Sequence, residues 1–381
     1  MKLDNVRLDS VHLETTLVRA AAEPDPSTAA VAPPIHLATT FEHPADGEES
    51  QGHIYIRESN PTQSRLEEAL AASEGGAAAF FCASGMAAGT ILLQSLEDGA
   101  HVLFPDDVYH GFREAVQSLM PRWGLTATFV DMTDLDEVRR ALRPETRLLW
   151  AESPSNPLLK IADLEALTGI AHEHGAEIVV DSTFATPVLQ RPLELGADFV
   201  LHSATKYMGG HSDVQGGVLV LRESDRLAEL LHIRLVGGAA ASPFNAWLVL
   251  RGLRSMVCRV ERHAANALAV AEALEGHPGI EQVYYPGLAK HPGHAIARRQ
   301  MKAFGGMVSL AIAGGREAAI RVASRVRLFT NATSLGGVES LVEHRASYEG
   351  KVSTTPQNLL RLSIGLEHPE DLIADLRQAL D

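Results

Sequence analysis

Lys206 stands in a segment whose residue types could do chemistry on an aldehyde. It follows the apolar run 199–202 and is surrounded by hydroxyls and glycines, among them Ser203 and Thr205. A lysine beside a buried strand is costly to desolvate, so its pKa falls readily and its neutral amine can form a Schiff base. The hydroxyls of Ser203 and Thr205 suit an anion held beside that amine. A surface lysine in a glycine turn is the alternative, and the rest of the sequence must decide between them.

The segment around Gly85 predicts an anion site. An apolar run over 77–83 ends in Ser84-Gly85-Met86, and helix-forming alanines follow, which indicates a strand, a tight turn and a helix. The first N–H groups of such a helix are unpaired and carry partial positive charge, so they suit a phosphate. The alternative is that Gly85 only makes the turn.

Three further residues each have a functional and a structural interpretation. Asp181 ends the β-branched run 177–181, where a carboxylate needs a partner: a helix cap, an arginine or the protonated nitrogen of a pyridine ring. Tyr109 could stack on such a ring or lie half-buried in a loop. Arg361 stands in an apolar strand pattern, so it needs a carboxylate from a ligand or from a structural salt bridge.

Strand and helix patterns alternate along the first two thirds of the chain. We expect strands over 77–83, 101–104, 126–130, 147–151, 177–181 and 199–202, and helices over 63–73, 112–123 and 163–174. Such alternation predicts right-handed crossovers and an α/β fold with a mostly parallel, buried sheet. Binding sites of open parallel sheets lie beyond the carboxyl ends of the strands. Gly85, Tyr109, Asn156, Asp181 and Lys206 stand at or just past such ends, so we expect them to meet.

The chain divides into three parts. At 381 residues it exceeds the size of one typical core. We expect an N-terminal arm over 1–55 with a proline-rich stretch, a large domain over 56–245, and a smaller α+β C-terminal domain over 246–381. The last of these contains a long helical region over 243–274 and strands near 306–313 and 358–367.

Composition and charge exclude several classes of protein. The formal net charge of −15 disfavours a nucleic-acid or anionic-membrane partner. The apolar runs are too short to span a membrane, and the sequence begins with no signal segment, so we expect a cytoplasmic protein. Cys82 and Cys258 predict neither a disulfide framework nor a metal site. The G-x-G-x-x-G turn of nicotinamide dehydrogenases is missing from the strand-to-helix turns.

Seven motifs in the same order resemble one enzyme family. They are Tyr55-x-Arg57-x-x-Asn60-Pro61-Thr62, Ala83-Ser84-Gly85-Met86-Ala87-Ala88, Glu152-Ser153-Pro154-Ser155-Asn156-Pro157, Val180-Asp181-Ser182-Thr183-Phe184, Ser203-Ala204-Thr205-Lys206-Tyr207, Ser334-Leu335-Gly336-Gly337-Val338-Glu339-Ser340 and Arg361-Leu362-Ser363-Ile364-Gly365-Leu366-Glu367. Together they resemble the Cys/Met-metabolism family of pyridoxal 5′-phosphate (PLP) enzymes. The resemblance implies the aspartate-aminotransferase-like fold type I.

The resemblance also implies a role for each motif. Lys206 would carry PLP and move protons, with Tyr109 as the second catalytic residue. The residues implied to bind PLP are Tyr55, Arg57, Gly85, Met86, Tyr109, Asp181, Ser203, Thr205 and Lys206. Tyr55 and Arg57 would act in the site of a neighbouring subunit, which implies a homotetramer built from dimers with shared active sites. The residues implied to bind substrate are Asn156, Ser334, Glu339 and Arg361.

The implied substrate is a small sulfur amino acid. Glu339 resembles an acidic residue that could face the distal ammonium of cystathionine, which favours γ-elimination of the cystathionine γ-lyase type. Methionine γ-lyase, cystathionine γ-synthase and O-acylhomoserine sulfhydrylase remain alternatives. The sequence departs from the family pattern at His110-Gly111-Phe112, where Gly-Gly-Thr or a cysteine-containing version is usual, and at Ser182, where Asn is common. It also departs at Arg345, where Pro is common.

Overall fold

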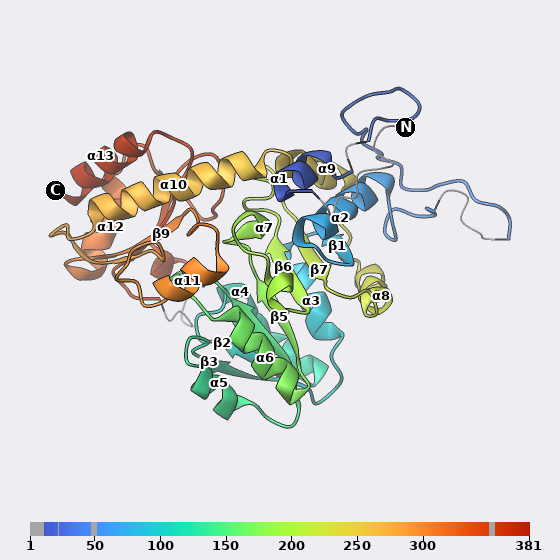
Figure 1. The fold of residues 1–381 in the computed structure, drawn as a ribbon, viewed down its shortest axis with the longest axis horizontal. Coiled ribbons are helices and arrows are strands. Elements are labelled where there is room, and N and C mark those ends of the chain that lie inside the picture. Colours follow the sequence, from blue (N-terminus) through green and yellow to red (C-terminus); the bar gives the residue numbers. More distant parts are fainter. Residues whose placement is uncertain (1–10, 22, 47–51, 350–354) are drawn as a thin grey trace.

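A seven-stranded sheet forms the centre of the larger part of the molecule (Figure 1). The computed structural model describes residues 11–21, 23–46, 52–349 and 355–381. The strand order is β1-β7-β6-β5-β4-β2-β3. The strands are β1 (Ala78–Cys82), β2 (His101–Pro105), β3 (Thr126–Val130), β4 (Thr146–Glu152), β5 (Glu177–Asp181), β6 (Phe199–Ser203) and β7 (Gly217–Leu221). The pairs from β3 to β6 are parallel and only β7 pairs antiparallel with its neighbours, so the prediction of a mostly parallel sheet is confirmed.

Helices cover both faces of this sheet, which is why most residues of its central strands are apolar and buried. One core joins α3 and α8 to the sheet through Phe80, Phe104 and Trp150, and another joins α6 through Leu149 and Ile178. The helices of this part are α2 (Pro61–Glu74), α3 (Gly85–Gln94), α4 (His110–Ser118), α5 (Leu135–Ala141), α6 (Leu164–His174), α7 (Thr186–Leu189) and α8 (Leu227–Gly237), with the 3₁₀ turns η2 (Met120–Trp123) and η3 (Pro192–Leu195).

Two expected helices are interrupted in the structure. The region 112–123 divides into α4 and η2, because Pro121 has no N–H to donate and its ring clashes with the preceding helical turn. The region 243–274 divides into α9 (Pro243–Leu253) and α10 (Met256–Leu274). At the start of α2 the side chain of Asn60 caps the helix by accepting the Thr62 N–H at 2.9 Å.

A second, smaller sheet lies in the C-terminal part, in the order β10-β11-β12-β9-β8. Its strands are β8 (Ile280–Tyr284), β9 (Met307–Ile312), β10 (Thr330–Asn331), β11 (Leu341–Glu343) and β12 (Leu359–Ser363). Only β10 and β11 pair in parallel. This sheet shares a core with α10, α12 (Gly315–Arg325) and α13 (Pro369–Leu380), while α11 (His294–Gln300) and η4 (Arg345–Ser347) complete this part.

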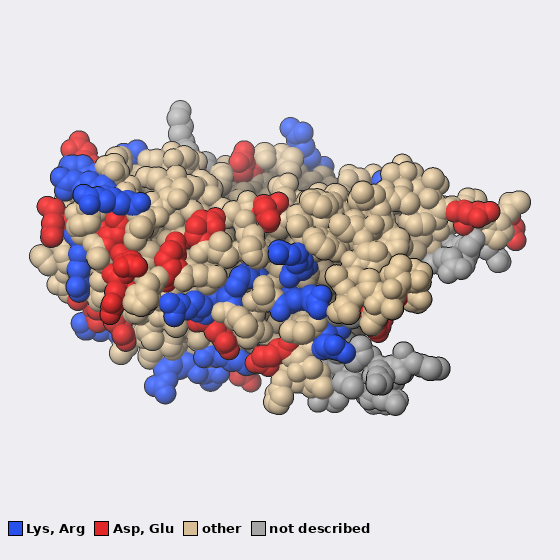
Figure 2. Space-filling view, turned by 90° about the horizontal axis from the view of Figure 1, so that it is seen from above, with Lys and Arg blue, Asp and Glu red and all other residues tan. Residues whose placement is uncertain are grey.

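The N-terminal segment contributes α1 (Leu13–Arg19), which packs beside α2 and α9 (Figure 1). The arm reaches away from the body on the side opposite the C-terminal sheet. Charged side chains gather at the C-terminal end of the face in Figure 2, whereas much of the other end is uncharged. Within the described ranges, no helix combines the length and the apolar character needed to cross a bilayer. The domain limits at residues 56 and 246 remain predictions.

Candidate functional site

One cavity of about 430 Å³ lies where the carboxyl ends of the large sheet's strands face the C-terminal part. Most of the predicted site residues line it: Gly85, Met86, Tyr109, Asn156, Asp181, Ser203, Thr205, Lys206, Ser334 and Arg361. The strand-end rule therefore brought together residues that lie far apart in the sequence. Tyr55, Arg57 and Glu339 do not line the cavity.

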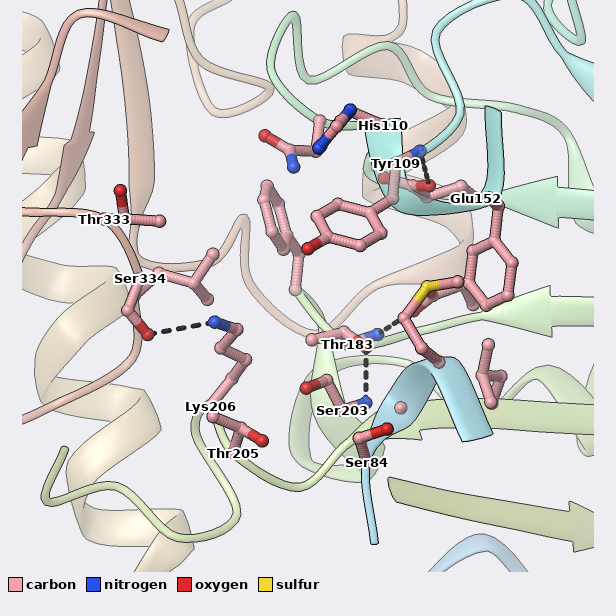
Figure 3. A pocket seen from close by; sticks show the side chains of 18 of the residues that line it. Ser84, Tyr109, His110, Glu152, Thr183, Ser203, Thr205, Lys206, Thr333 and Ser334 are labelled. Atoms are coloured by element: carbon pink, nitrogen blue, oxygen red, sulfur yellow. Dashed lines mark hydrogen bonds between the residues drawn. The ribbon is translucent and has the colours of Figure 1, made fainter. Parts of the chain in front are cut away.

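Lys206 reaches into this cavity from the turn that follows β6 (Figure 3). Its Nζ donates a hydrogen bond to Ser334 Oγ at 2.9 Å, so the amine joins the two halves of the site. Burial, followed by the nearby positive charge of Arg361, lowers the pKa of Lys206 to about 8. A substantial fraction of this amine is therefore neutral and nucleophilic near neutral pH.

Hydroxyl groups and a helix N-terminus form an anion cradle on the adjoining side. Ser84 caps α3, its Oγ accepting the Ala87 N–H at 3.1 Å. Gly85 allows close packing here, because a Cβ at that position would lie 3.1 Å from Ser203 Cβ. Figure 3 shows Ser84, Thr183, Ser203 and Thr205 gathered along this side of the cavity. The unpaired N–H groups and hydroxyls together suit a phosphate.

Two carboxylates lie side by side at the ends of neighbouring strands. Glu152 of β4 is paired in register with Asp181 of β5. Asp181 accepts the Thr183 N–H at 3.0 Å, and burial raises the pKa of the Asp181 carboxyl. Burial and the Asp181 charge raise the pKa of Glu152 well above its ordinary value, although Glu152 accepts the Tyr109 N–H at 2.9 Å. Sequence reasoning missed Glu152, which the strand-end rule would have included.

Tyr109 lines the cavity and is the N-cap residue of α4. The residue is 38% exposed, so part of it is accessible to a ligand. The ring makes edge contacts with Phe112 and His110 at centroid distances of 6.4 and 6.0 Å. His110 and Phe112, the departures noted in the sequence, both line the cavity.

Arg361 of β12 extends from the C-terminal sheet into the same cavity. Its guanidinium donates to Asn156 Oδ1 at 3.0 Å, to the Ser334 carbonyl at 3.1 Å and to Glu343 Oε2 at 2.6 Å. Burial, and then the charge of Arg345, lowers the pKa of Arg361 to about 10. The salt bridge is therefore present, and Arg361 also lines the cavity, so its binding of a ligand carboxylate remains a prediction. Ser334 has a φ of +116°, a conformation that is costly for a residue with a Cβ.

Sequence reasoning did not single out several other residues of this wall. Thr333, Arg345, Tyr348 and Glu349 line the cavity, and Glu343 lies behind it. Of these five residues, only Arg345 stood out in the sequence, because it departs from the family pattern.

The comparisons with known proteins agree over nearly the whole chain. Residues 14–381 match the family described as Cys/Met metabolism PLP-dependent enzyme. The chain belongs to this family. It is 47% identical to cystathionine gamma-synthase of Mycobacterium bovis, with 96% of each chain covered. It is 42% identical to cystathionine gamma-lyase of Dictyostelium discoideum, covering 96% of this chain and 97% of the relative.

A solved structure agrees as well. Cystathionine gamma synthase of Xanthomonas oryzae pv. oryzae in complex with cystathionine superposes with a TM-score of 0.94 at 43% identity, covering 97% of this chain and 98% of that one. The protein is therefore a PLP-dependent enzyme of fold type I, and the family, fold and cofactor predictions are confirmed.

The residues of the cavity fit PLP. The lysine amine suits the aldehyde, the cradle at the start of α3 suits the phosphate, and the buried Asp181 carboxylate needs a positive partner such as a protonated ring nitrogen. A glycine at 217 is also required, because a Cβ there would collide with the Ser84 carbonyl oxygen that leads into α3.

The three predicted residues outside the cavity lie in two places. Tyr55 is 43% exposed and Arg57 is exposed, with the guanidinium carbon 5.4 Å from the centre of the Tyr55 ring. Their role in a neighbouring subunit remains a prediction. Glu339 accepts a hydrogen bond from Ser212. It neither caps a helix nor pairs with Arg345, whose ion pairs are with Glu343 and Glu349.

Proposed function

We propose that this protein cleaves the Cγ–S bond of cystathionine by γ-elimination, which with one water molecule yields cysteine, 2-oxobutyrate and ammonia. The observation that carries the proposal is the single cavity in which the Lys206 amine, its pKa lowered to about 8, lies with the Arg361 guanidinium. An α-amino acid has a carboxylate that matches the guanidinium and an amine that can take the place of the Lys206 amine at the cofactor aldehyde. The family membership supplies the cofactor.

Different residues of the chain would hold the cofactor and the substrate. PLP, when bound, supplies an electron sink that stabilises negative charge developing at the substrate carbon. Asp181 would hold the proton on the ring nitrogen, and Tyr109 would stack on the ring. The N–H groups at Gly85 and Met86, with the hydroxyls of Ser203 and Thr205, would hold the phosphate.

The reaction itself needs a base and a proton donor. Arg361, assisted by Asn156 and Ser334, would hold the substrate carboxylate and so fix the Cα–H bond relative to Lys206. Lys206 Nζ would then take the proton from Cα, a step for which a pKa near 8 is well suited. The Tyr109 hydroxyl would pass a proton to the departing sulfur.

The second candidate is γ-replacement, in which a thiol adds to an activated homoserine. The observation that favours it is that the relative named a synthase is 47% identical, against 42% for the one named a γ-lyase. The lyase preference rested on Glu339, which does not line the cavity of its own chain. Methionine γ-lyase and O-acylhomoserine sulfhydrylase activity remain further alternatives within the same chemistry.

A substrate panel tests the proposal. The purified protein with PLP is assayed with cystathionine, methionine and O-acylhomoserines, the last with and without cysteine, and 2-oxobutyrate, thiol and cystathionine are all measured. Elimination predicts 2-oxobutyrate and cysteine from cystathionine at the highest kcat/KM. Cystathionine formed from O-acylhomoserine plus cysteine at higher kcat/KM would instead establish the synthase. No turnover of any of these compounds would contradict both candidates.

We also propose a homotetramer, built from dimers that share active sites, in the cytoplasm. Large apolar side chains are exposed on the arm, α8 and α9, among them Val31 at 67%, Leu37 at 65%, Val236 at 71% and Phe244 at 50%. A second copy of the chain would cover such surface. The exposed free thiol of Cys258 suits a reducing compartment.

A further inference from the structure

Four buried charged side chains of alternating sign form a chain along the cavity wall: Glu349, Arg345, Glu343 and Arg361. All but Glu343 line the cavity. Each is at most 7% exposed. Arg345 donates to Glu349 Oε1 from Nε at 3.0 Å and from Nη2 at 2.7 Å. Its Nη1 donates to Glu343 Oε2 at 3.1 Å. The same Glu343 oxygen accepts from Arg361 at 2.6 Å.

Glu343 is the centre of this four-charge chain. Its Oε2 serves both guanidinium groups, while its Oε1 accepts the Thr333 hydroxyl at 2.6 Å. Thr333 precedes Ser334, whose carbonyl accepts from Arg361 and whose hydroxyl accepts from Lys206. The Glu343 carboxylate therefore holds the wall on which the substrate carboxylate is proposed to bind.

This arrangement poses an electrostatic problem for an incoming carboxylate. Arg361 already has a carboxylate at 2.6 Å, and a substrate carboxylate on the same guanidinium would be a second negative charge beside Glu343. Repulsion between buried like charges is strong, because little water is present to screen it. Arg345 counters it, since the Glu343 charge is divided between two guanidinium groups. In this net-neutral set of two arginines and two glutamates, the residual positive charge lies at the Arg361 end and the residual negative charge at Glu349.

We propose that Arg345 is a positioning residue that keeps Arg361 available for the substrate carboxylate, acting through the shared Glu343. This inference rests on the proposed role of Arg361 and concerns amino-acid affinity rather than the choice between elimination and replacement. Arg345 is also a position at which the sequence departs from the family pattern, where Pro is common.

A pair of small ligands separates this role from a general structural one. Glycine carries an amine and a carboxylate, whereas methylamine carries the amine alone. Each is titrated into the PLP-loaded protein, and the dissociation constant is read from the change in visible absorbance. Arg345→Met is expected to weaken glycine binding about tenfold, equivalent to about 1.4 kcal/mol, and to leave methylamine binding within twofold. Arg345→Lys, which keeps the charge, should recover at least half of the loss on a logarithmic scale.

Three further variants make the test decisive. Arg345→Pro introduces the residue that is common in the family at the first position of η4, where proline is tolerated. If Arg345→Met folds poorly, Arg345→Pro is used in its place and should weaken glycine binding to a similar extent. Arg345→Met takes the arginine away from both Glu343 and Glu349, so the double variant Glu343→Gln with Arg345→Met removes the carboxylate that bonds to Arg361 and should restore part of the glycine affinity. Arg316→Met is the matched control, because Arg316 is exposed and bonds to Ser347 of η4 without touching Glu343.

Equal losses for glycine and methylamine, or no loss for glycine, would overturn the role of Arg345. The proposed function fails differently. If Arg361→Met leaves glycine binding unchanged, Arg361 does not bind the carboxylate. If the wild-type protein shows no spectral change with either amine, the amine-binding chemistry itself is absent.

Discussion

The two walls of the cavity are built in different ways. The cofactor wall consists of short segments that follow strand ends: 84–86 after β1, Asp181 at the end of β5 and 203–206 after β6. Its hydrogen bonds use backbone groups and hydroxyls, such as the Ser84 cap of α3 and the Thr183 N–H on Asp181. The substrate wall is held by buried ion pairs around Glu343 and by the bond between Arg361 and Asn156, which are 205 residues apart.

This difference separates two kinds of specificity. Backbone groups at strand ends are set by the fold, so they suit a cofactor that every family member binds. Side-chain charges can change without altering the sheet, so the substrate wall can differ between relatives. Variants of the cofactor wall should therefore affect all substrates alike, whereas variants of the substrate wall should separate one ligand from another.

Lys206→Ala should have the largest effect of any cofactor-wall variant. Loss of general acid–base catalysis alone lowers kcat by about 10²- to 10⁴-fold, and loss of the covalent link to PLP adds to this. Borohydride reduction followed by peptide mass analysis should place PLP on Lys206 in the wild type and nowhere in the variant. PLP found covalently bound to another lysine would refute the assignment.

Asp181→Asn should come next. Removing one partner of a buried ion pair costs about 3–5 kcal/mol, so we expect PLP retention to fall by at least about a hundredfold. The dissociation constant is measured by fluorescence on the apo-protein, with Glu370→Gln, a surface change in the first turn of α13, as the control. Unchanged affinity would mean that the ring nitrogen does not bind at Asp181.

The pH dependence of PLP uptake tests the cofactor wall in the apo-protein. Burial disfavours the charged form of Lys206, and its pKa falls from 10.5 to about 8. The neutral amine reacts with the aldehyde, so the uptake rate should rise with pH and level off above about pH 8. At pH 8 the neutral fraction is about a hundredfold larger than that of an ordinary lysine. A rate that still rises between pH 9 and 10 would show that the pKa is not lowered.

Arg57→Ala should weaken PLP binding about 10- to 100-fold, the value of a charge-assisted hydrogen bond, although Arg57 is exposed and outside its own cavity. Mixing Arg57→Ala subunits with Lys206→Ala subunits should restore some activity, because hybrid dimers regain sites with both groups intact. Subunit exchange is verified by native mass spectrometry, which also reports the tetramer. Exchange without recovery would count against shared sites.

Glu339→Ala should have the smallest effect. Because Glu339 bonds to Ser212 and does not line the cavity, the loss of its carboxylate should affect both substrates alike. We expect the ratio of kcat/KM on cystathionine to that on methionine to change less than about threefold. The melting temperature serves as the control for stability. A selective fall of tenfold or more on cystathionine would establish Glu339 as the residue that reads the distal ammonium.

The sequence by itself determined the cofactor wall. Alternating apolar runs and helices predicted the parallel sheet, and the strand-end rule then placed Gly85, Tyr109, Asp181 and Lys206 at one edge. This was possible because each of these residues is positioned by its own strand, so its place follows from local periodicity. The same reasoning would have included Glu152 if the strand 147–151 had been extended by one residue.

Only the tertiary structure decided the substrate wall. From the sequence, the carboxylate partner of Arg361 could be either a ligand or a glutamate or aspartate of the chain. Nothing in the spacing of Glu343, Arg345 and Glu349 indicates that their side chains form one buried chain with Arg361. It also could not show that Glu339 bonds to Ser212 outside the cavity. Ion pairs form between side chains that the packing of two sheets brings together, and that packing is encoded by no single segment of the chain.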